Sequence, residues 1–344
     1  MPIASSPIAS RESRQTNRLL RRASQQTEEI VVNADRIERA IRALRACQGF
    51  YRPGTNGPLF LFLCGGDDAN PSYICRKHVE MHIAISPNLR RVFAVKPEIL
   101  LNKYSSVTSS VNLLELEALI ADLSDAILLF DESPGSLCEL GAFAMSDPIR
   151  EIMTVCVPAK YRGEKSFAVQ GPVRHVEQNE TEMSKVIYLD VDCPFASVDL
   201  LKYFDSLERR VDAAAKRKIN RGPDAVDFGA FCRECLDLVA IFAPLTDREL
   251  LEIYKRYKGF DAFKFRVRSL RTVPRNLSYK IALAYLASTG LITYDYESGE
   301  LDMIGDAPSY FMFGPEKRQR IQFVRAMLLS FKRKSHKEIN SVYR

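Results

Sequence analysis

The stretch from Phe130 to Ala144, FDESPGSLCELGAFA, contains the residue types and spacing best suited to chemistry. The apolar run Ala126–Phe130 is typical of a buried strand, and the acidic Pro-Gly-Ser turn after it leads into a helical segment whose first turn we expect to carry Glu139. In open α/β sheets, ligands bind at the carboxyl ends of the strands, where N–H groups of a helix start can face a phosphate or a sugar. Glu139 is therefore the candidate nucleophile for attack on an anomeric carbon, kept ionised by the positive end of its helix.

Glu139 also has a purely structural interpretation. Ser136 and Glu139 have the spacing of a capping box, in which the Glu side chain folds back onto the Ser N–H and completes the helix end. Spacing alone leaves both interpretations open.

A second glycine turn, CGGDD at residues 64–68, follows the apolar segment Leu59–Leu63. Glycines let backbone N–H groups approach a ligand closely, and neighbouring acids can hold sugar hydroxyls. Neither glycine turn is a Walker loop or a GxGxxG fingerprint, so each one alone is weak support for a nucleotide site.

Length and composition indicate a globular protein of two or three domains, with 344 residues, 46% of them hydrophobic and 27% charged. No apolar run approaches the roughly eighteen residues of a membrane span, and we expect a soluble, cytoplasmic protein that does not bind membranes. The eight cysteines are scattered, which predicts reduced and buried thiols. The Cys232–Cys235 pair and the His78–His82 pair lack further ligands at zinc spacing, so we expect neither a metal nor a cofactor.

Predicted strands alternate with helical segments over the first half of the chain. The strands are Leu59–Leu63, Arg91–Val95, Ala126–Phe130, Thr154–Val157 and Val186–Leu189. This alternation predicts an α/β fold with a doubly wound parallel sheet. We place the catalytic domain at residues 47–193, after a basic arm and an amphipathic helix at residues 1–46.

Beyond Pro194 the pattern becomes helical, with a predicted helical connector at residues 194–245. Residues 246–305 combine a helix capped by Thr246, with Glu249 three residues on, a helix at 278–288, and a hairpin that turns at Ser298-Gly299. Helices followed by a β-hairpin are the outline of a winged helix. A basic helix is expected within residues 306–344.

Positive charge is concentrated between Tyr254 and Lys280, where nine basic residues accompany the single acid Asp261. Charge of this sign and density attracts a phosphate backbone, and a solvated face on a protein-docking module is the alternative. The candidate nucleic-acid-binding residues are Lys255, Arg256, Lys258, Lys264, Arg266, Arg268, Arg271, Arg275 and Lys280.

Several motifs together resemble the effector proteins of bacterial retrons, whose N-terminal domain is similar to nucleoside deoxyribosyltransferases. The motifs are CGGDDAN at 64–70, Pro97-Glu98, LLELEALIADLSDAILLF at 113–130, ESPGSLCELGAFA at 132–144 and SFAVQGPVR at 166–174. The resemblance runs from about Gly49 to Arg174 and continues more loosely through the winged-helix unit to the basic tail. It implies a flavodoxin-like fold, with Glu139 as the catalytic residue.

The chemistry implied by the resemblance is attack of Glu139 on C1′ of a ribosyl or deoxyribosyl group as the N-linked base departs. The simple transferases lack the C-terminal half and carry a YLAGP-like first strand end, so we favour hydrolysis by an N-glycosidase over base exchange. NAD+ or a related nucleotide or nucleoside is the implied substrate. The candidate substrate-binding residues are Gly65, Gly66, Asp67, Glu98, Glu117, Asp125, Ser133, Gly135 and Ser136. Asp125 has a structural alternative as a residue that caps or ends a helix.

The resemblance also implies partners, namely a retron reverse transcriptase with its msDNA or non-coding RNA, and a homo-oligomer or higher assembly. A winged helix reads DNA with its second or third helix in a groove and its wing on the backbone. The alternative function is a non-catalytic, nucleic-acid-binding regulator whose α/β domain only senses a nucleotide.

Overall fold

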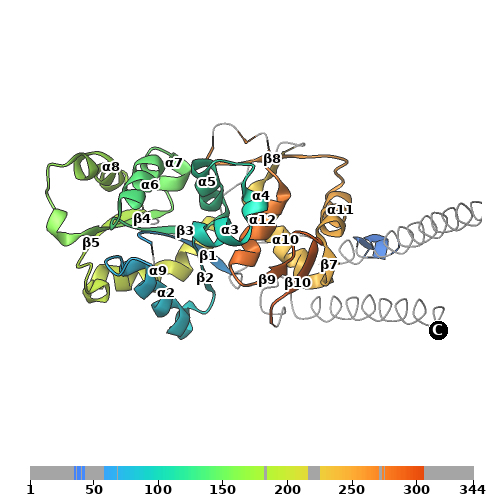
Figure 1. Cartoon of the computed structure of the whole chain (residues 1–344), viewed down its shortest axis with the longest axis horizontal. Coiled ribbons are helices and arrows are strands. Elements are labelled where there is room, and N and C mark those ends of the chain that lie inside the picture. Colours follow the sequence, from blue (N-terminus) through green and yellow to red (C-terminus); the bar gives the residue numbers. More distant parts are fainter. Residues whose placement is uncertain are drawn as a thin grey trace, which may run out of the picture.

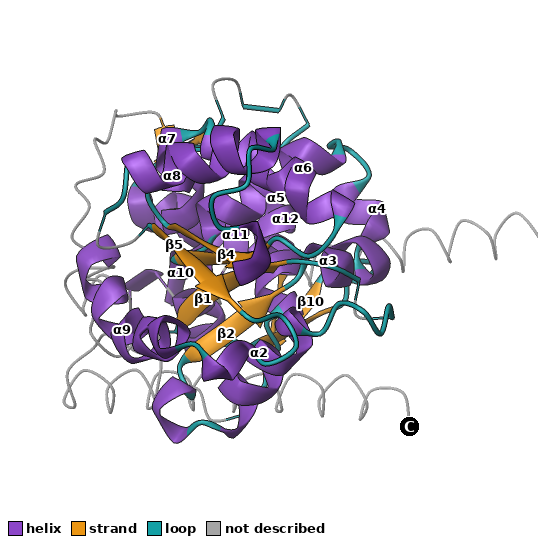
Figure 2. Cartoon of the chain, turned by 90° about the vertical axis from the view of Figure 1, so that its left-hand side faces the viewer, coloured by secondary structure: helices purple, strands orange, loops and turns teal. Residues whose placement is uncertain are grey.

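A five-stranded parallel sheet forms the centre of the N-terminal half (Figures 1 and 2). In the computed structural model, the described residues are 35, 37–39, 41–42, 58–67, 69–181, 184–215, 225–270, 273–274 and 276–305. The strands are β1 (Leu59–Cys64), β2 (Val92–Val95), β3 (Ala126–Phe130), β4 (Met153–Pro158) and β5 (Lys185–Leu189). Their order is β2-β1-β3-β4-β5, so the chain changes winding direction beside β1, between β1 and β3. The predicted α/β fold and parallel sheet are confirmed.

Helices cover both faces of this sheet. On one face lie α2 (Cys75–Ile85) and α9 (Val198–Ala215), which share a core with Leu59, Leu61 and Leu63. On the other lie α3 (Pro97–Lys103), α4 (Ser105–Thr108), α5 (Leu113–Leu123), α6 (Pro134–Ala144), α7 (Asp147–Arg150) and α8 (Arg174–Gln178). The helix that we expected in a connector, α9, is therefore part of the sheet's own packing. The segment around GPVR is helical: Val169–Val173 form a π-helical turn that continues into α8.

The C-terminal half contains a second, smaller sheet. The elements of the C-terminal half are β6 (Ala225–Asp227), α10 (Phe228–Phe242), β7 (Leu245–Thr246), α11 (Asp247–Lys258), β8 (Lys264–Arg266), α12 (Tyr279–Ser288), β9 (Ile292–Tyr294) and β10 (Glu300–Met303). Strands β7, β10 and β9 pair antiparallel in that order, which confirms the predicted hairpin, and Gly299 takes the positive φ of 78° at its turn. The predicted capping box between Thr246 and Glu249 is also confirmed. The parallel pairing of β6 with β8 was not predicted.

Helix α12 is a core helix. All residues from Ile281 to Ala287 are buried, and they belong to the same hydrophobic core as the α5 face of the parallel sheet. The Tyr285 ring packs edge-on against Phe60 of β1 with centroids 5.4 Å apart, and its hydroxyl lies 3.0 Å from Ser124 Oγ. The expectation that a second or third helix enters a DNA groove therefore does not fit α12, the second described helix of residues 246–305, because its residues Ile281–Ala287 face the α/β half.

Among the described cysteines, all are free thiols, and Cys64, Cys75, Cys156, Cys232 and Cys235 are buried as expected, whereas Cys138 and Cys193 are exposed. No helix of the described residues has the length and apolarity needed to cross a membrane.

Candidate functional site

The candidate site lies at the carboxyl edge of the parallel sheet, where β1, β2 and β3 end. Gly65 and Gly66 follow β1, Glu98 follows β2, and Glu132 follows β3. Glu139 and Glu117 reach the same region from helices α6 and α5. The neighbouring strands β1 and β3 are the point at which ligands bind in sheets of this order.

Glu139 is largely buried, and its Oε2 atom accepts no hydrogen bond from the described residues. The thiol of Cys64, the last residue of β1, is hydrogen-bonded to the same carboxylate. Burial, the nearby Glu117 and Glu98 carboxylates and too little compensating positive charge raise the pKa of Glu139 to about 8. Glu139 therefore combines a carboxylate that is costly to ionise with a buried oxygen to which no described residue donates.

Glu117 is the charged group with the largest effect on the pKa of Glu139. It is 8% exposed, and burial together with the charge of Glu98 raises its pKa to about 7. Two carboxyl groups whose surroundings give them different pKa values can divide the roles of nucleophile and proton donor. The structure thus brings together three of the predicted site residues, Glu139, Glu117 and Glu98.

Arg76 supplies the positive charge among these carboxylates, and the sequence analysis did not identify it. Its side chain is 3% exposed, and its Nη1 atom donates to Glu98 Oε1 at 2.7 Å. Its charge lowers the pKa of both Glu139 and Cys64, against the larger effect of burial. A signal was present in the sequence: Arg76 is the second residue of α2, and a cation in the first turn of a helix opposes the helix dipole.

The start of α6 differs from the expectation. The helix begins at Pro134, and its N-cap is Ser133, which forms a reciprocal capping box with Ser136. Ser133 Oγ accepts from the Ser136 N–H at 3.1 Å, and Ser136 Oγ accepts from the Ser133 N–H at 3.0 Å. Glu139 is therefore the sixth helical residue, in the second turn, and the capping-box interpretation of Glu139 is wrong.

The same cap determines which atoms of Ser133, Gly135 and Ser136, all predicted to bind substrate, are available to a ligand. Ser136 is fully buried, and its hydroxyl is engaged by the cap and by the Glu132 N–H at 3.3 Å. Gly135 is exposed on the first turn of α6. A ligand can reach the Gly135 backbone directly, whereas a contact with the Ser136 hydroxyl would require the cap to open.

Glu132 organises the CGGDD turn at residues 64–68, a role that was not predicted from the sequence. Its Oε1 atom accepts from the Gly66 N–H at 3.2 Å, and its Oε2 atom accepts from the Cys75 N–H at 3.3 Å. A Cβ atom on Gly66 would lie 2.2 Å from the Tyr73 ring, and one on Gly65 would lie 2.9 Å from Glu132 Oε1. Close packing against Tyr73 therefore requires glycine at position 66, whereas at position 65 the Glu132 carboxylate would have to move. The Gly66 N–H is already used by Glu132.

Asp67 and Asp125 are not part of the carboxylate cluster. Asp67 is exposed and closes a local turn by accepting from the Ala69 N–H at 3.0 Å. Asp125 precedes β3, at the opposite edge of the sheet from Glu139; its Oδ2 accepts from the Phe60 N–H at 3.0 Å and its Oδ1 pairs with Arg233 of α10. The expectation that Asp125 lines the substrate site is corrected, because its carboxylate joins β1 to the C-terminal half.

The nine predicted nucleic-acid-binding residues divide by their partners. Four form ion pairs with acids of the chain: Arg256 with Glu252, Lys258 with Glu234, Arg268 with Asp122, and Lys280 with Asp247. Lys255, Lys264 and Arg266 form no ion pair with the described residues, and Arg271 and Arg275 lie outside the described residues.

Arg268 is the clearest structural member of this set. Its guanidinium approaches buried Asp122 of α5 at 3.4 Å, and its backbone N–H donates to the same carboxylate at 2.9 Å. Arg268 therefore fastens the basic segment onto α5 and is not free to face a phosphate.

No group of three or more His, Cys, Asp or Glu side chains among the described residues could hold a metal ion. The side chains gathered at the β1/β3 edge are the carboxylates Glu139, Glu117 and Glu98, the Arg76 guanidinium and the Cys64 thiol. A parallel sheet with a carboxylate cluster at its switch point defines an α/β protein with a candidate nucleotide or sugar site.

Residues 73–294, more than half of the chain, match the STM3845 retron effector protein family. The chain belongs to this family and is a retron effector.

Two Escherichia coli proteins are similar to it. One, named "Retron Ec86 putative ribosyltransferase/DNA-binding protein", is 38% identical over 130 residues, which are 37% of this chain and 40% of that protein. The other, named "Retron Ec73 putative ribosyltransferase/DNA-binding protein", is 26% identical over 261 residues, which are 70% of this chain and 78% of that protein. The Ec86 match thus spans less than half of that relative's length.

Proposed function

We propose that this retron effector is an N-glycosidase that breaks the C1′–N bond of NAD+ or a related nucleotide or nucleoside, with Glu139 as the nucleophile. The observation that carries the proposal is the state of Glu139 at the β1/β3 switch point of the sheet. Its buried Oε2 atom accepts no hydrogen bond from the described residues, and its pKa is raised to about 8. A carboxylate whose pKa is raised by burial and by neighbouring charges, at the strand ends where ligands bind, is a candidate for a functional site. The ribosyltransferase names of the two relatives agree with a reaction at C1′.

The proposed reaction has two steps. The ionised Glu139 carboxylate forms a bond to C1′ while the C1′–N bond breaks, and the bonding pair leaves with the base. A pyridinium base departs neutral without a proton, whereas a purine requires one. Because the pKa of Glu139, about 8, lies above that of Glu117, about 7, the reactive form is the minor state of the pair in which Glu139 is ionised and Glu117 holds the proton. Water then adds to C1′, the Glu139–C1′ bond breaks, and a neighbouring carboxylate takes the proton of the water.

Arg76 and Glu132 act on the site through other groups. Arg76 offsets part of the mutual repulsion of the carboxylates, which keeps a fraction of Glu139 ionised. Glu132 fixes the Gly66 turn and the start of α2, from which Arg76 projects. The nucleoside deoxyribosyltransferase-like assignment of residues 47–193 comes from the motif resemblance, and the parallel sheet with carboxylates at its carboxyl edge supports it.

The C-terminal half is proposed to hold the effector in a retron complex of reverse transcriptase and msDNA. The element order from α10 to β10 and the sheet order β7-β10-β9 support a winged-helix assignment for this unit. Both relatives carry DNA-binding in their names. The second candidate function is a nucleic-acid-binding regulator without catalysis. It is favoured by Lys255, Lys264 and Arg266, which form no ion pair with the described residues.

The deciding experiment compares metabolites of cells that express the wild-type chain, Glu139→Gln, or the exposed control Glu164→Gln. We expect the wild type and Glu164→Gln to deplete NAD+ and accumulate nicotinamide, or to release free nucleobases, and Glu139→Gln to do neither. Turnover of NAD+, nucleotides and nucleosides by the purified proteins checks that the effect is direct. Equal activity of Glu139→Gln and wild type would refute the assignment of the nucleophile.

A further inference from the structure

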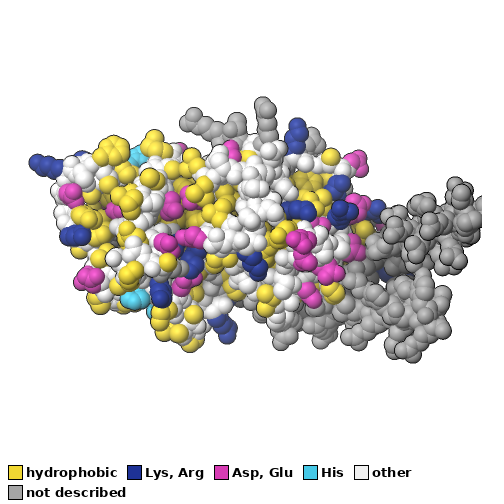
Figure 3. All heavy atoms as spheres, in the orientation of Figure 1, with side chains coloured by type: hydrophobic (Ala, Val, Ile, Leu, Met, Phe, Trp, Pro, Cys, Tyr) yellow, Lys and Arg dark blue, Asp and Glu magenta, His cyan; other side chains and the backbone are white. Residues whose placement is uncertain are grey.

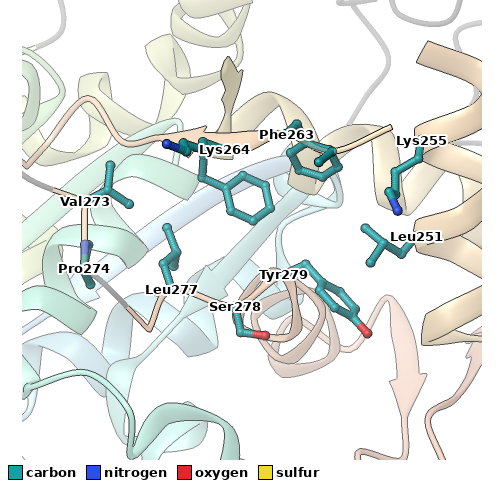
Figure 4. A pocket seen from close by; sticks show the side chains of 11 residues that line it. Leu251, Lys255, Phe263, Lys264, Val273, Pro274, Leu277, Ser278 and Tyr279 are labelled. Carbon is teal, nitrogen blue, oxygen red and sulfur yellow. The ribbon is translucent and has the colours of Figure 1, made fainter. Parts of the chain in front are cut away.

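An open groove of about 710 Å³ lies in the C-terminal half, within the size range of ligand sites (Figure 4). Phe263 and Lys264 border it on one side and Tyr279 on the other, while Leu251 and Lys255 project into it from α11. Val273, Pro274 and Leu277 complete its walls. The space-filling view shows a hollow of hydrophobic side chains bordered by Lys and Arg side chains over α11 and β8 (Figure 3).

The charged side chains among the described lining residues of the groove are both positive. Lys255 and Lys264 line it from α11 and from β8, and neither forms an ion pair with the described residues. Arg266, two residues along β8 from Lys264, is likewise unpaired among them. No acidic side chain is among the described residues that line the groove. The occupant that balances cations arranged along a strand and a helix is a polymer with repeated negative charge.

The aromatic wall of the groove is held rigid. The Phe263 ring packs against Phe265 with centroids 5.2 Å apart, against Tyr254 at 5.6 Å and against Phe231 at 5.9 Å. Phe263 is nevertheless only partly buried, so part of it faces the groove. Fixed aromatic faces beside lysines are the combination that binds single-stranded nucleic acids, since bases stack on the rings and phosphates meet the cations.

Duplex DNA suits this surface less well. The bases of a duplex are stacked on each other and cannot reach an apolar groove, and α12, the helix that would enter a DNA groove, is buried. We propose that this groove binds unpaired bases of a single-stranded nucleic acid, with Lys255 and Lys264 on the adjoining phosphates. The proposal rests on the proposed nucleic-acid role of the C-terminal half and gives that role a site and a strand preference.

The test measures binding of a labelled DNA oligonucleotide of about 20 nucleotides, longer than the site of one such groove. The full-length protein is titrated against the single strand and against the same strand annealed to its complement, at several salt concentrations. We expect the single strand to bind more tightly. The double variant Lys255→Ala/Lys264→Ala should reduce the salt dependence of single-strand binding by about 1.4 in slope, which corresponds to two lost phosphate contacts.

Two matched controls separate the groove from general charge and general apolar surface. Lys77→Ala/Lys160→Ala removes the same charge from exposed positions of the α/β half and should leave the slope unchanged. Phe263→Leu keeps an apolar side chain in the cluster and should weaken single-strand binding about tenfold while duplex binding stays the same. Phe167→Leu, at a position 87% exposed, should change neither. Thermal unfolding confirms that each variant is folded.

A position-specific readout completes the test. A single strand that contains 5-iododeoxyuridine should photocrosslink to Phe263 or Tyr279, mapped by mass spectrometry. Equal binding of single strand and duplex, or single-strand binding that Phe263→Leu does not alter, would overturn the proposal and leave the groove to a protein partner. Failure of both DNA forms to bind at low salt would refute the nucleic-acid role itself, while the Glu139 experiment would remain a separate test of catalysis.

Discussion

Replacement of Glu117 by Gln should shift the pH dependence of Glu139. The nucleophile must be ionised to attack, so kcat/KM rises as pH increases through the pKa of Glu139 in the free enzyme. With a pKa of about 8, roughly a tenth of Glu139 is ionised at pH 7. Glu117→Gln keeps the shape of the side chain and removes the negative charge that contributes most to this pKa after burial.

The expected shift is about one pKa unit downward. Burial is the larger cause of the raised pKa and persists in the variant, so the value should not return to the ordinary 4.5. A decrease of one unit is worth about 1.4 kcal/mol and makes the ionised fraction about tenfold larger on the acid side. If Glu117 also donates a proton, the maximal rate decreases with substrates whose base needs protonation, but the midpoint of the acid limb still moves.

The midpoint is measured in two ways. One is the pH profile of kcat/KM for whichever substrate the metabolite comparison identifies. The other is an infrared titration of the protonated carboxyl band, taken as the difference between each protein and its Glu139→Gln counterpart, which requires no turnover. The exposed Glu164→Gln variant should keep the wild-type midpoint. A wild-type midpoint near 4.5, or one that Glu117→Gln leaves in place, would contradict the electrostatic account of the site.

Three further changes test the structure around the site. Glu139→Gln should be more stable than the wild type by a few kcal/mol at pH 9 but not at pH 5. The wild type loses stability as pH rises from 4.5 to about 8, because Glu139 ionises in the unfolded chain before it ionises in the folded protein. Urea unfolding of both proteins at the two pH values checks this. Ser133→Ala should cost about 1 kcal/mol of stability through loss of the α6 cap, whereas Ser133→Asp should retain most of it in thermal unfolding. Arg268→Ala should cost about 2 kcal/mol in urea unfolding, because Asp122 stays buried with only backbone donors, and Arg266→Ala should cost much less.

The strands of the parallel sheet could be predicted because burial on both faces leaves a local signal. Strand β3 was predicted with its observed bounds, Ala126–Phe130, and β1 differs by one residue. All five residues of β3 are buried, so its composition is apolar without alternation. The capping box at Thr246 was equally visible, since both of its partners lie within four residues of each other.

The details of the site could not be predicted to the same degree, because they depend on which of several local options packing selects. Ser133 and Ser136 are three residues apart in the sequence, as are Ser136 and Glu139, so both pairs have the spacing of a capping box. The start of α6 at Pro134 selects the first pair. The Arg76–Glu98 pair and the Asp125–Arg233 pair join residues 22 and 108 positions apart. No spacing rule relates such residues, so Arg76 was missed and Asp125 was assigned to the wrong edge of the sheet.

The burial of α12 changes how the two halves of this effector relate. A DNA-reading unit ordinarily presents its last helix to solvent, whereas here that helix completes the core shared with β1 and α5. Among the described residues, the groove proposed for a nucleic acid lies around the segment between α11 and α12. Arg268 and Ser269 bind this segment to α5, and the Ser269 hydroxyl donates to the Ala118 carbonyl at 2.7 Å. Ala118 directly follows Glu117 in α5. The basic segment therefore packs on the helix whose Glu117 carboxylate, after burial, contributes most to the raised pKa of Glu139. In this architecture, Arg268 and Ser269 of the basic segment contact the helix that carries Glu117, whereas Glu139 lies on the separate helix α6.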